Sequence, residues 1–182
     1  MADINEMRKE THMKLYTINN RKDFMGKLLN SDCFDAFLLQ EATIRMACSY
    51  VIDGKVNTEF YQGEVSEENN CLYDYAEWKT MRSLCFQLIK GKMTPLSFHF
   101  ILSLKPEHLS ALLKQATLEN SGINVSHFLI NIKFDQSGLS ITSGVSYTAF
   151  SLNKDGEALW DKSLTSFLSN KGIDFEIPVS FN

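Results

Sequence analysis

The chain has 182 residues, of which 44% are hydrophobic and 22% are charged, and its formal net charge is −4. A chain of this size can bury a core without disulfides or a structural metal. The composition excludes a collagen-like or strongly basic protein, and the sequence has no run of about 18 apolar residues that would predict a membrane span. We therefore expect no membrane association, and the negative charge argues against a dedicated nucleic-acid-binding protein.

Residues 1–13 form a polar N-terminal arm without the apolar segment of a signal peptide. The four cysteines form no CxxC pair and have no histidine at metal-ligand spacing. Cys48 and Cys85 lie in apolar patterns that are typical of reduced core thiols. The sequence therefore predicts a cytoplasmic protein that needs no cofactor and no metal.

Hydrophobic patterning in the first half predicts a strand at 15–18, then a helix that Asn19 or Asn20 caps. A long strand-like stretch at 38–52 follows, with a bulge or corner near Glu41. Asp53-Gly54 predicts a two-residue hairpin turn. Residues 62–75 carry four acids and no basic residue, and we expect a solvated excursion with an edge strand near Tyr73.

The segment from Trp78 to Phe100 predicts one helix, a stop at Gly91 and Pro95, and one strand. The inward face of this helix is predicted to carry Trp78, Met81, Leu84, Cys85, Leu88 and Ile89, and the following strand to turn Leu96, Phe98, Phe100 and Leu102 inward.

The second half predicts a helix that begins at Pro106, with Leu109, Leu112, Leu113 and Ala116 inward, and that ends at 120–122. A strand at 128–134, a turn at 135–138 and an extended segment at 139–152 follow. The last helix carries Trp160, Leu164, Phe167 and Leu168 inward, and Gly172 closes it. The tail at 173–181 is expected to add a short strand.

The order strand, helix, strand, strand, helix occurs twice, in residues 15–91 and 96–172, with Trp78 and Trp160 at corresponding places. Such an order reflects either a duplicated unit or a chance repeat, and the sequence leaves both open. We expect an α+β fold in which residues 14–182 form one domain of antiparallel sheet, with the helices packed on one face.

Three stretches, from Phe34 to Ile44, from Ile52 to Gly54 and from Cys85 to Phe98, resemble an uncharacterised bacterial family of unknown function. This resemblance implies no activity. Residues 104–152, with a helix, a strand, an Asp-to-Gly turn and a second strand, are similar in architecture to a unit of the DNA sliding clamp. That similarity implies a clamp-like fold and carries little functional weight.

A basic face on the helix at 78–89 is the leading candidate for a binding site. Lys79, Arg82 and Lys90 fall within about 80° of one another on a helical projection, with Phe86 between them. No acidic residue occurs from Lys79 to Lys92. The face is either a solvated surface, a surface neutralised by the acidic segment 62–75, or a docking site for a polyanion or an acidic protein.

Asp32, Asp35 and Glu41 offer a second hypothesis, an enzyme for small molecules that joins these carboxylates to aromatic residues of segment 62–75. Caps and turns account for the same carboxylates. The sequence favours a non-enzymatic binding or scaffold protein that contacts an anionic partner, and it is compatible with a homo-oligomer.

Overall fold

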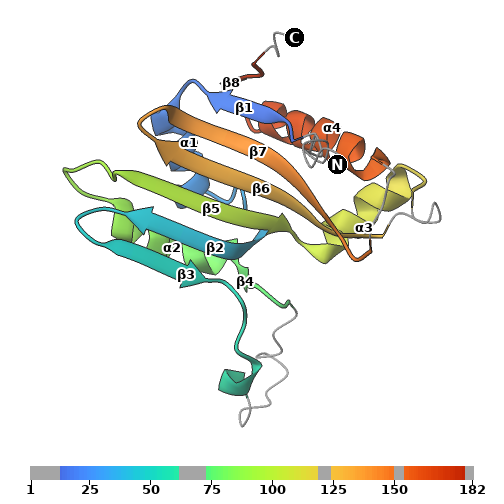
Figure 1. The fold of residues 1–182 in the computed structure, drawn as a ribbon, viewed down its shortest axis with the longest axis horizontal. Helices are drawn as coiled ribbons and strands as arrows, with labels where there is room; N and C mark the ends of the chain where they lie inside the picture. The colour runs from blue at the N-terminus through green and yellow to red at the C-terminus, as the bar shows by residue number, and fades with distance from the viewer. Residues whose placement is uncertain (1–12, 62–72, 119–123, 150–153, 179–182) are drawn as a thin grey trace, which may run out of the picture.

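One antiparallel sheet organises the protein. The structure is a computed structural model that describes residues 13–61, 73–118, 124–149 and 154–178. Eight strands lie in the order β3-β2-β5-β6-β7-β1-β8, with β4 beside β2 (Figure 1). The predicted α+β class is confirmed, and both the first and the last of the described strands belong to this sheet.

The elements and their bounds are as follows: β1 (Leu15–Ile18), α1 (Arg21–Asn30), β2 (Phe37–Arg45), β3 (Ser49–Asp53), the 3₁₀-helix η1 (Thr58–Tyr61), β4 (Ala76–Glu77), α2 (Trp78–Ile89), β5 (Ser97–Leu104), α3 (Pro106–Gln115), β6 (Val125–Asp135), β7 (Gly138–Tyr147), α4 (Asp155–Asn170) and β8 (Phe175–Glu176).

The helices cover one face of the sheet. In Figure 1, α1, α2 and α4 lie behind the strands and α3 lies at their right-hand end. Alternate strand residues on this inner face are buried, which follows from the two-residue period of a strand. The residues buried on the inner face of the four central strands include Ala42, Ile44, Phe98, Phe100, Leu102, Phe128, Ile130, Ile132, Leu139 and Ile141.

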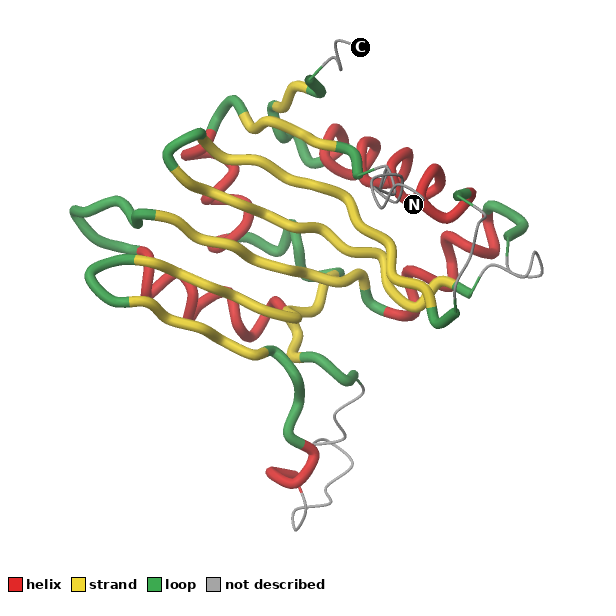
Figure 2. The backbone as a smooth tube through the Cα atoms, viewed as in Figure 1, coloured by secondary structure: helices red, strands yellow, loops and turns green. Residues whose placement is uncertain are grey.

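The opposite face, here called the open face, carries mainly polar side chains. Paired residues Thr43, His99, Lys133 and Ser140 cross it on four neighbouring strands. Figure 2 shows the strands in front and the helices behind them. Within the described residues no helix packs on the open face, which is the usual arrangement for an antiparallel sheet with one solvated side.

The first hairpin turns at residues 46–48, and the prediction of a turn at Asp53-Gly54 was wrong. Met46 N–H donates to Cys48 O over 2.9 Å, and β3 then pairs with β2 from Ser49 to Asp53. Gly54 serves a different purpose, since a Cβ there would lie 1.8 Å from Leu39 O. The strand register shifts beside it, between Leu39 and Glu41, so the predicted bulge is confirmed.

Helix ends follow their sequence signals. The Asn20 side chain accepts a hydrogen bond from Asp23 N–H over 3.1 Å, and Pro106 occupies the first turn of α3. Gly172 has φ +62° just beyond α4, the left-handed conformation that favours glycine. The tail adds β8, which pairs with β1. The helix that was predicted to end at 120–122 ends earlier, because α3 stops at Gln115 and Ala116 caps it. The arm at 1–12 lies outside the described residues.

Three side chains expected in the core are exposed instead. Leu84 is 46% exposed on α2, Leu96 is 63% exposed just before β5, and Cys48 is exposed in the β2–β3 turn. Leu96 precedes the strand whose alternation predicted its burial. Cys33 and Cys85 are buried free thiols, and Cys71 lies outside the described residues.

The strand pairing does not repeat between the two halves of the chain. In the second half β5 pairs with β6, whereas the corresponding β1 pairs with β7 and β8 and not with β2. Trp78 and Trp160 are both buried, but the Trp78 indole N–H donates to Leu28 O on α1 and that of Trp160 to Leu129 O on β6. An internal repeat is therefore not shown.

Candidate functional site

A groove between α3 and α4 is the candidate site that the structure adds. Of the stripe that α3 was expected to bury, only Leu109 is buried, whereas Leu112, Leu113 and Ala116 are half-buried. These side chains remain partly open because α3 packs against the end of β6 and leaves space on its α4 side. The apolar face of α3 therefore lines a cavity.

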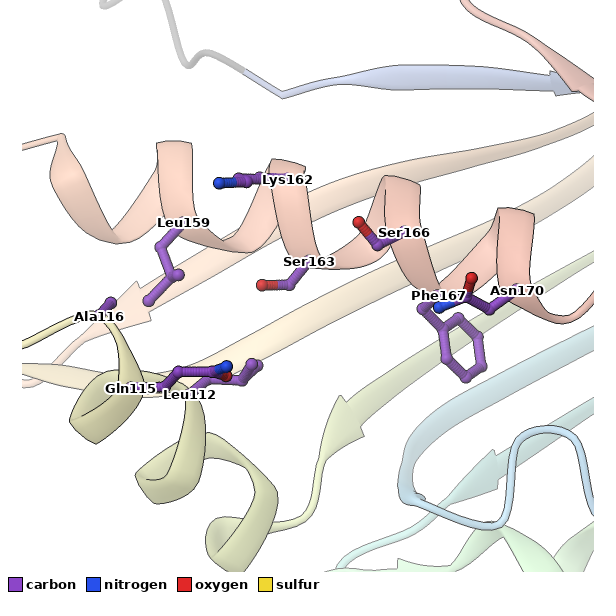
Figure 3. A pocket seen from close by; sticks show the side chains of 9 residues that line it. All are labelled: Leu112, Gln115, Ala116, Leu159, Lys162, Ser163, Ser166, Phe167 and Asn170. Atoms are coloured by element: carbon purple, nitrogen blue, oxygen red, sulfur yellow. The ribbon is translucent and has the colours of Figure 1, made fainter.

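The groove, here called the α3–α4 groove, has a volume of about 680 Å³. In Figure 3, Leu159, Ser163 and Phe167 project from α4 and Leu112 and Gln115 from α3. The full lining is Leu112, Gln115, Ala116, Leu159, Lys162, Ser163, Ser166, Phe167 and Asn170. Most of this surface is apolar or uncharged.

A second cavity of about 290 Å³ adjoins the groove and shares Leu112, Gln115, Ser163 and Phe167 with it. Phe37, Leu104 and Trp160 make its apolar wall. The two cavities together offer an open surface with an apolar recess, which is the form that a binding site for an apolar anchor takes.

The α4 wall of the groove is held rigidly on the sheet. The Trp160 indole N–H donates to Leu129 O over 2.8 Å, and the Trp160 ring stacks on Phe128 with centroids 4.9 Å apart. Further along the helix, Tyr16 Oη lies 2.9 Å from Thr165 Oγ1. These contacts fix α4 on the sheet, so the α4 wall of the groove is preformed.

The charged side chains at the groove are basic. Lys162 belongs to its lining, and Lys171 Nζ lies 6.0 Å from the centre of the Phe167 ring. Within the described residues no Asp or Glu lines either cavity. A protein with a net charge of −4 thus presents a locally acid-free and partly apolar surface here.

The predicted site on α2 is partly committed to internal contacts. The Arg82 guanidinium donates to Ser31 O and pairs with Asp35 Oδ1 at 2.7 Å. Phe86 packs against the core, and Lys90 Nζ lies 6.0 Å from its ring centre. Lys79 is exposed. The structure places Lys79, Phe86 and Lys90 on one side of α2 and directs Arg82 towards the turn before β2.

The three carboxylates of the enzyme hypothesis do not converge, because Glu41 lies apart from Asp32 and Asp35. Asp35 pairs with Arg82, Asp32 belongs to the same turn, and Glu41 lies on the open face, where Thr43 Oγ1 donates to its Oε1. Among the described residues no group of three His, Cys, Asp or Glu side chains could hold a metal ion.

Tyr73 and Tyr75, the aromatic residues of segment 62–75 in the enzyme hypothesis, line a pocket whose lining does not include Asp32, Asp35 or Glu41. Their cavity of about 180 Å³ also includes Ser126 and His127. Tyr73 Oη donates to Glu107 Oε1 over 2.6 Å, and this hydrogen bond raises the pKa of Tyr73 to about 12. The His127 ring lies edge-on to Tyr75 with centroids 6.2 Å apart.

Sequence reasoning identified three of the nine residues that line the groove, and it identified them only as core positions. Leu112, Ala116 and Phe167 belong to ordinary apolar helix faces. No local pattern distinguishes an apolar face that is fully covered from one that is half-covered. The distance between α3 and α4 decides this difference, and it depends on residues far apart in the chain.

A model of a family of unknown function (DUF5721) matches residues 27–176. No curated protein and no solved structure matches the chain, so the expected similarity to the sliding clamp has no support. None of the described helices is both long and apolar enough for a membrane span. The matched residues include all the helices after α1 and most of the sheet, and the chain belongs to the DUF5721 family.

Proposed function

We propose that the protein is a non-enzymatic binding protein that receives an acidic amphipathic helix of a protein partner in the α3–α4 groove. The observation that carries this proposal is the acid-free lining between two helices, with apolar surface from Leu112, Leu159 and Phe167 and with Lys162 at its rim. A groove of this kind is suited to the apolar face of a helix.

The length of the groove fits a short helix. Its α4 wall extends from Leu159 to Asn170, and a separation of eleven residues along a helix is about 16 Å. A partner helix of three turns therefore covers it, with apolar anchors at positions i, i+3 or i+4, and i+7. The recess beside Trp160 takes the largest of these anchors.

The anionic character of the partner follows from charge complementarity. Lys162 and Lys171 stand beside the groove, and acids on the flanks of the partner helix would meet them there. The basic face of α2 remains an alternative docking site for an anionic partner, through Lys79 and Lys90. The groove is favoured because the guanidinium of Arg82 already pairs with Asp35.

A selection from a library of helical peptides tests the proposal. Peptides enriched on the wild-type protein should carry apolar residues at i, i+4 and i+7 with Glu or Asp between them. Ser166→Glu places an acid in the groove and should weaken the binding of these peptides by about tenfold, because the new carboxylate repels their acidic side chains. Ser169→Glu is the matched control, since Ser169 is exposed on the same helix and does not line the groove.

Three results would contradict the groove proposal: basic or aperiodic peptides, equal weakening by both serine variants, or no enrichment. The double variant Lys79→Gln/Lys90→Gln tests the alternative site on α2. A peptide that binds the basic face of α2 should lose binding in this variant and keep it in Ser166→Glu.

A second candidate function, the binding or conversion of a small polar molecule, is favoured by the Tyr73–His127 pocket. The strand bulges between Val125 and His127, and Ser126 Oγ lies 3.2 Å from His127 Nδ1 inside that bulge. Bulges often re-aim side chains next to functional sites. In an NMR screen, fragments that bind in this pocket should shift the signals of the His127 ring. His127→Gln should abolish their binding, whereas His99→Gln on the open face should not.

A further inference from the structure

The two outer edges of the sheet differ in whether another strand covers them. At one edge β8 covers part of β1, through Thr17 and Ile18. At the other edge, within the described residues, no strand pairs with the outer side of β3. Natural proteins usually protect such an edge with Lys, Pro or a bulge. β3 contains none of these, and its central Val51 is 71% exposed.

The backbone of β3 is ready to accept another strand. Gly54 N–H donates to Gln40 O, and Met46 N–H donates to Cys48 O. These two hydrogen bonds, one at each end of the β2–β3 ladder, show which residue pairs are hydrogen-bonded. Since bonded and non-bonded pairs alternate in an antiparallel ladder, Tyr50 and Ile52 bond to β2. The backbone N–H and C=O groups of Ser49, Val51 and Asp53 then point away from the sheet.

We propose that β3 binds β3 of a second copy of this chain, antiparallel and about a twofold axis at Val51. In this register Val51 faces Val51 of the second copy, and Ser49 faces Asp53 of the second copy. It is the register in which all three outward-pointing residues of each strand find a hydrogen-bonding partner. The two sheets become one continuous sheet, and the interface is isologous.

The charges beside the edge are self-complementary in this register. On the open face Arg45 lies next to Ser49, whereas Glu41 lies next to Asp53, a pair of like charges on neighbouring strands. The twofold axis places the basic end of one copy against the acidic end of the other. Arg45 then reaches across the small Ser49 to Asp53 of the second copy, over two strand spacings or roughly 9.6 Å.

Asp53 keeps acceptor capacity for this contact. Its Oδ1 accepts a hydrogen bond from Lys55 N–H over 2.9 Å, and an ionised carboxylate has a second oxygen and further lone pairs. An arginine of the second copy would also offset the repulsion between Glu41 and Asp53.

Apolar side chains flank the edge on the inner face. Tyr50 is 38% exposed there, and Leu84 is 46% exposed on α2, which packs beneath β2. On a helical projection Leu84 lies on the side of α2 away from Arg82 and hence from α1. Five paired residues alone fall short of the roughly 1,600 Å² of a typical specific interface, so these side chains must contribute and we expect a weak, concentration-dependent dimer.

This interface is separate from the proposed peptide site. The α3–α4 groove involves the helix that packs on β7, whereas the dimer edge involves β3 and α2. The Ser166→Glu variant should therefore dimerise normally, and an edge variant should bind peptide normally. Failure of one proposal leaves the other unaffected.

Sedimentation velocity of the full chain over a range of concentrations tests the dimer. The wild type should shift from monomer to dimer as concentration rises, with slower amide exchange at Ser49, Val51 and Asp53. Val51→Lys places two ammonium groups opposite each other and should abolish the shift. Leu15→Lys is the matched control, because Leu15 is also an exposed strand residue (39%) but lies on β1, and it should dimerise as the wild type does.

A charge exchange tests the register. Arg45→Glu alone and Asp53→Arg alone should each weaken the dimer at least tenfold, since like charges then meet. An equal mixture of the two variants should recover it, because Glu at 45 meets Arg at 53 in one contact and the native pair forms in the other. A wild type that stays monomeric, equal effects of the two lysine variants, or a mixture without recovery would overturn the proposal.

Discussion

Two helix pairs of this protein pack differently: α1 and α2 are joined by direct contacts, whereas α3 and α4 leave a groove between them. In the α1–α2 pair, the Trp78 indole donates to a carbonyl of α1, and Arg82 pairs with Asp35 in the turn that follows α1. In the α3–α4 pair the facing side chains line a cavity of about 680 Å³ instead. A closed pair holds the fold together, and an open pair leaves apolar surface available to a partner.

The comparison is tested most directly by deleting the same side chain from each pair. Leu28→Ala removes a fully buried leucine from the closed pair and should lower the free energy of unfolding by about 2–5 kcal/mol. Leu112→Ala removes a half-buried leucine from the open pair, and we expect about 1 kcal/mol. Urea unfolding measures both. Equal losses would mean that the groove is filled in solution.

The next largest effect concerns pH and the buried thiol of the closed pair. Burial raises the pKa of Cys85 to about 11, because a thiolate there would lose its hydration. Above about pH 9 the unfolded chain releases the proton and the folded chain does not, so stability is complete below pH 9 and falls as pH rises towards 11.

A shift of about two pKa units corresponds to about 2–3 kcal/mol. The difference in unfolding free energy between the wild type and Cys85→Ala should shrink by this order between pH 8 and pH 11. Unfolding curves at a series of pH values measure it. A constant difference would show that Cys85 is hydrated, and that the closed pair is more open than the structure shows.

Local signals in the sequence predicted the frame of the molecule well. The cap at Asn20, the Pro106 start, the Gly172 stop and the Asp135-to-Gly138 turn each act within a few residues. Alternation of apolar residues also identified the inward faces of β5 and β6. These features depend on neighbouring residues, and one sequence is enough to read them.

Two kinds of feature were missed: a turn through which one apolar pattern continues, and contacts that depend on distant residues. The turn at 46–48 was hidden because apolar alternation continues from β2 through it into β3. The contact between Arg82 and Asp35 joins residues 47 apart, so the basic face of α2 looked uniform in the sequence. The groove depends on how far α3 stands from α4, which no local pattern encodes.

The Arg82–Asp35 pair should show a smaller effect than the buried thiol. Both side chains are partly exposed, at 23% and 27%, so solvent screens their attraction and we expect a coupling energy of about 0.5–1 kcal/mol. A double-mutant cycle with Arg82→Met and Asp35→Asn measures it. Lys162→Met at the rim of the groove is the control and should change stability by less than about 0.5 kcal/mol. A coupling energy of zero would mean that Asp35 does not hold the Arg82 guanidinium, and Arg82 could then bind a partner on the basic face of α2.

The smallest effect is expected where side-chain volume is added to the open pair. Ser163 is half-buried and lines both cavities of the groove, so Ser163→Leu should project into empty space and change the free energy of unfolding by no more than about 0.5 kcal/mol. The same enlargement in the closed pair, Cys85→Leu, meets a packed core and should cost about 1–3 kcal/mol. The Ser163 variant should also lose peptide binding, because its new side chain occupies the space that an anchor needs. A large loss of stability in that variant would mean that α3 and α4 close against each other in solution, and the proposed site would then have no room for a partner.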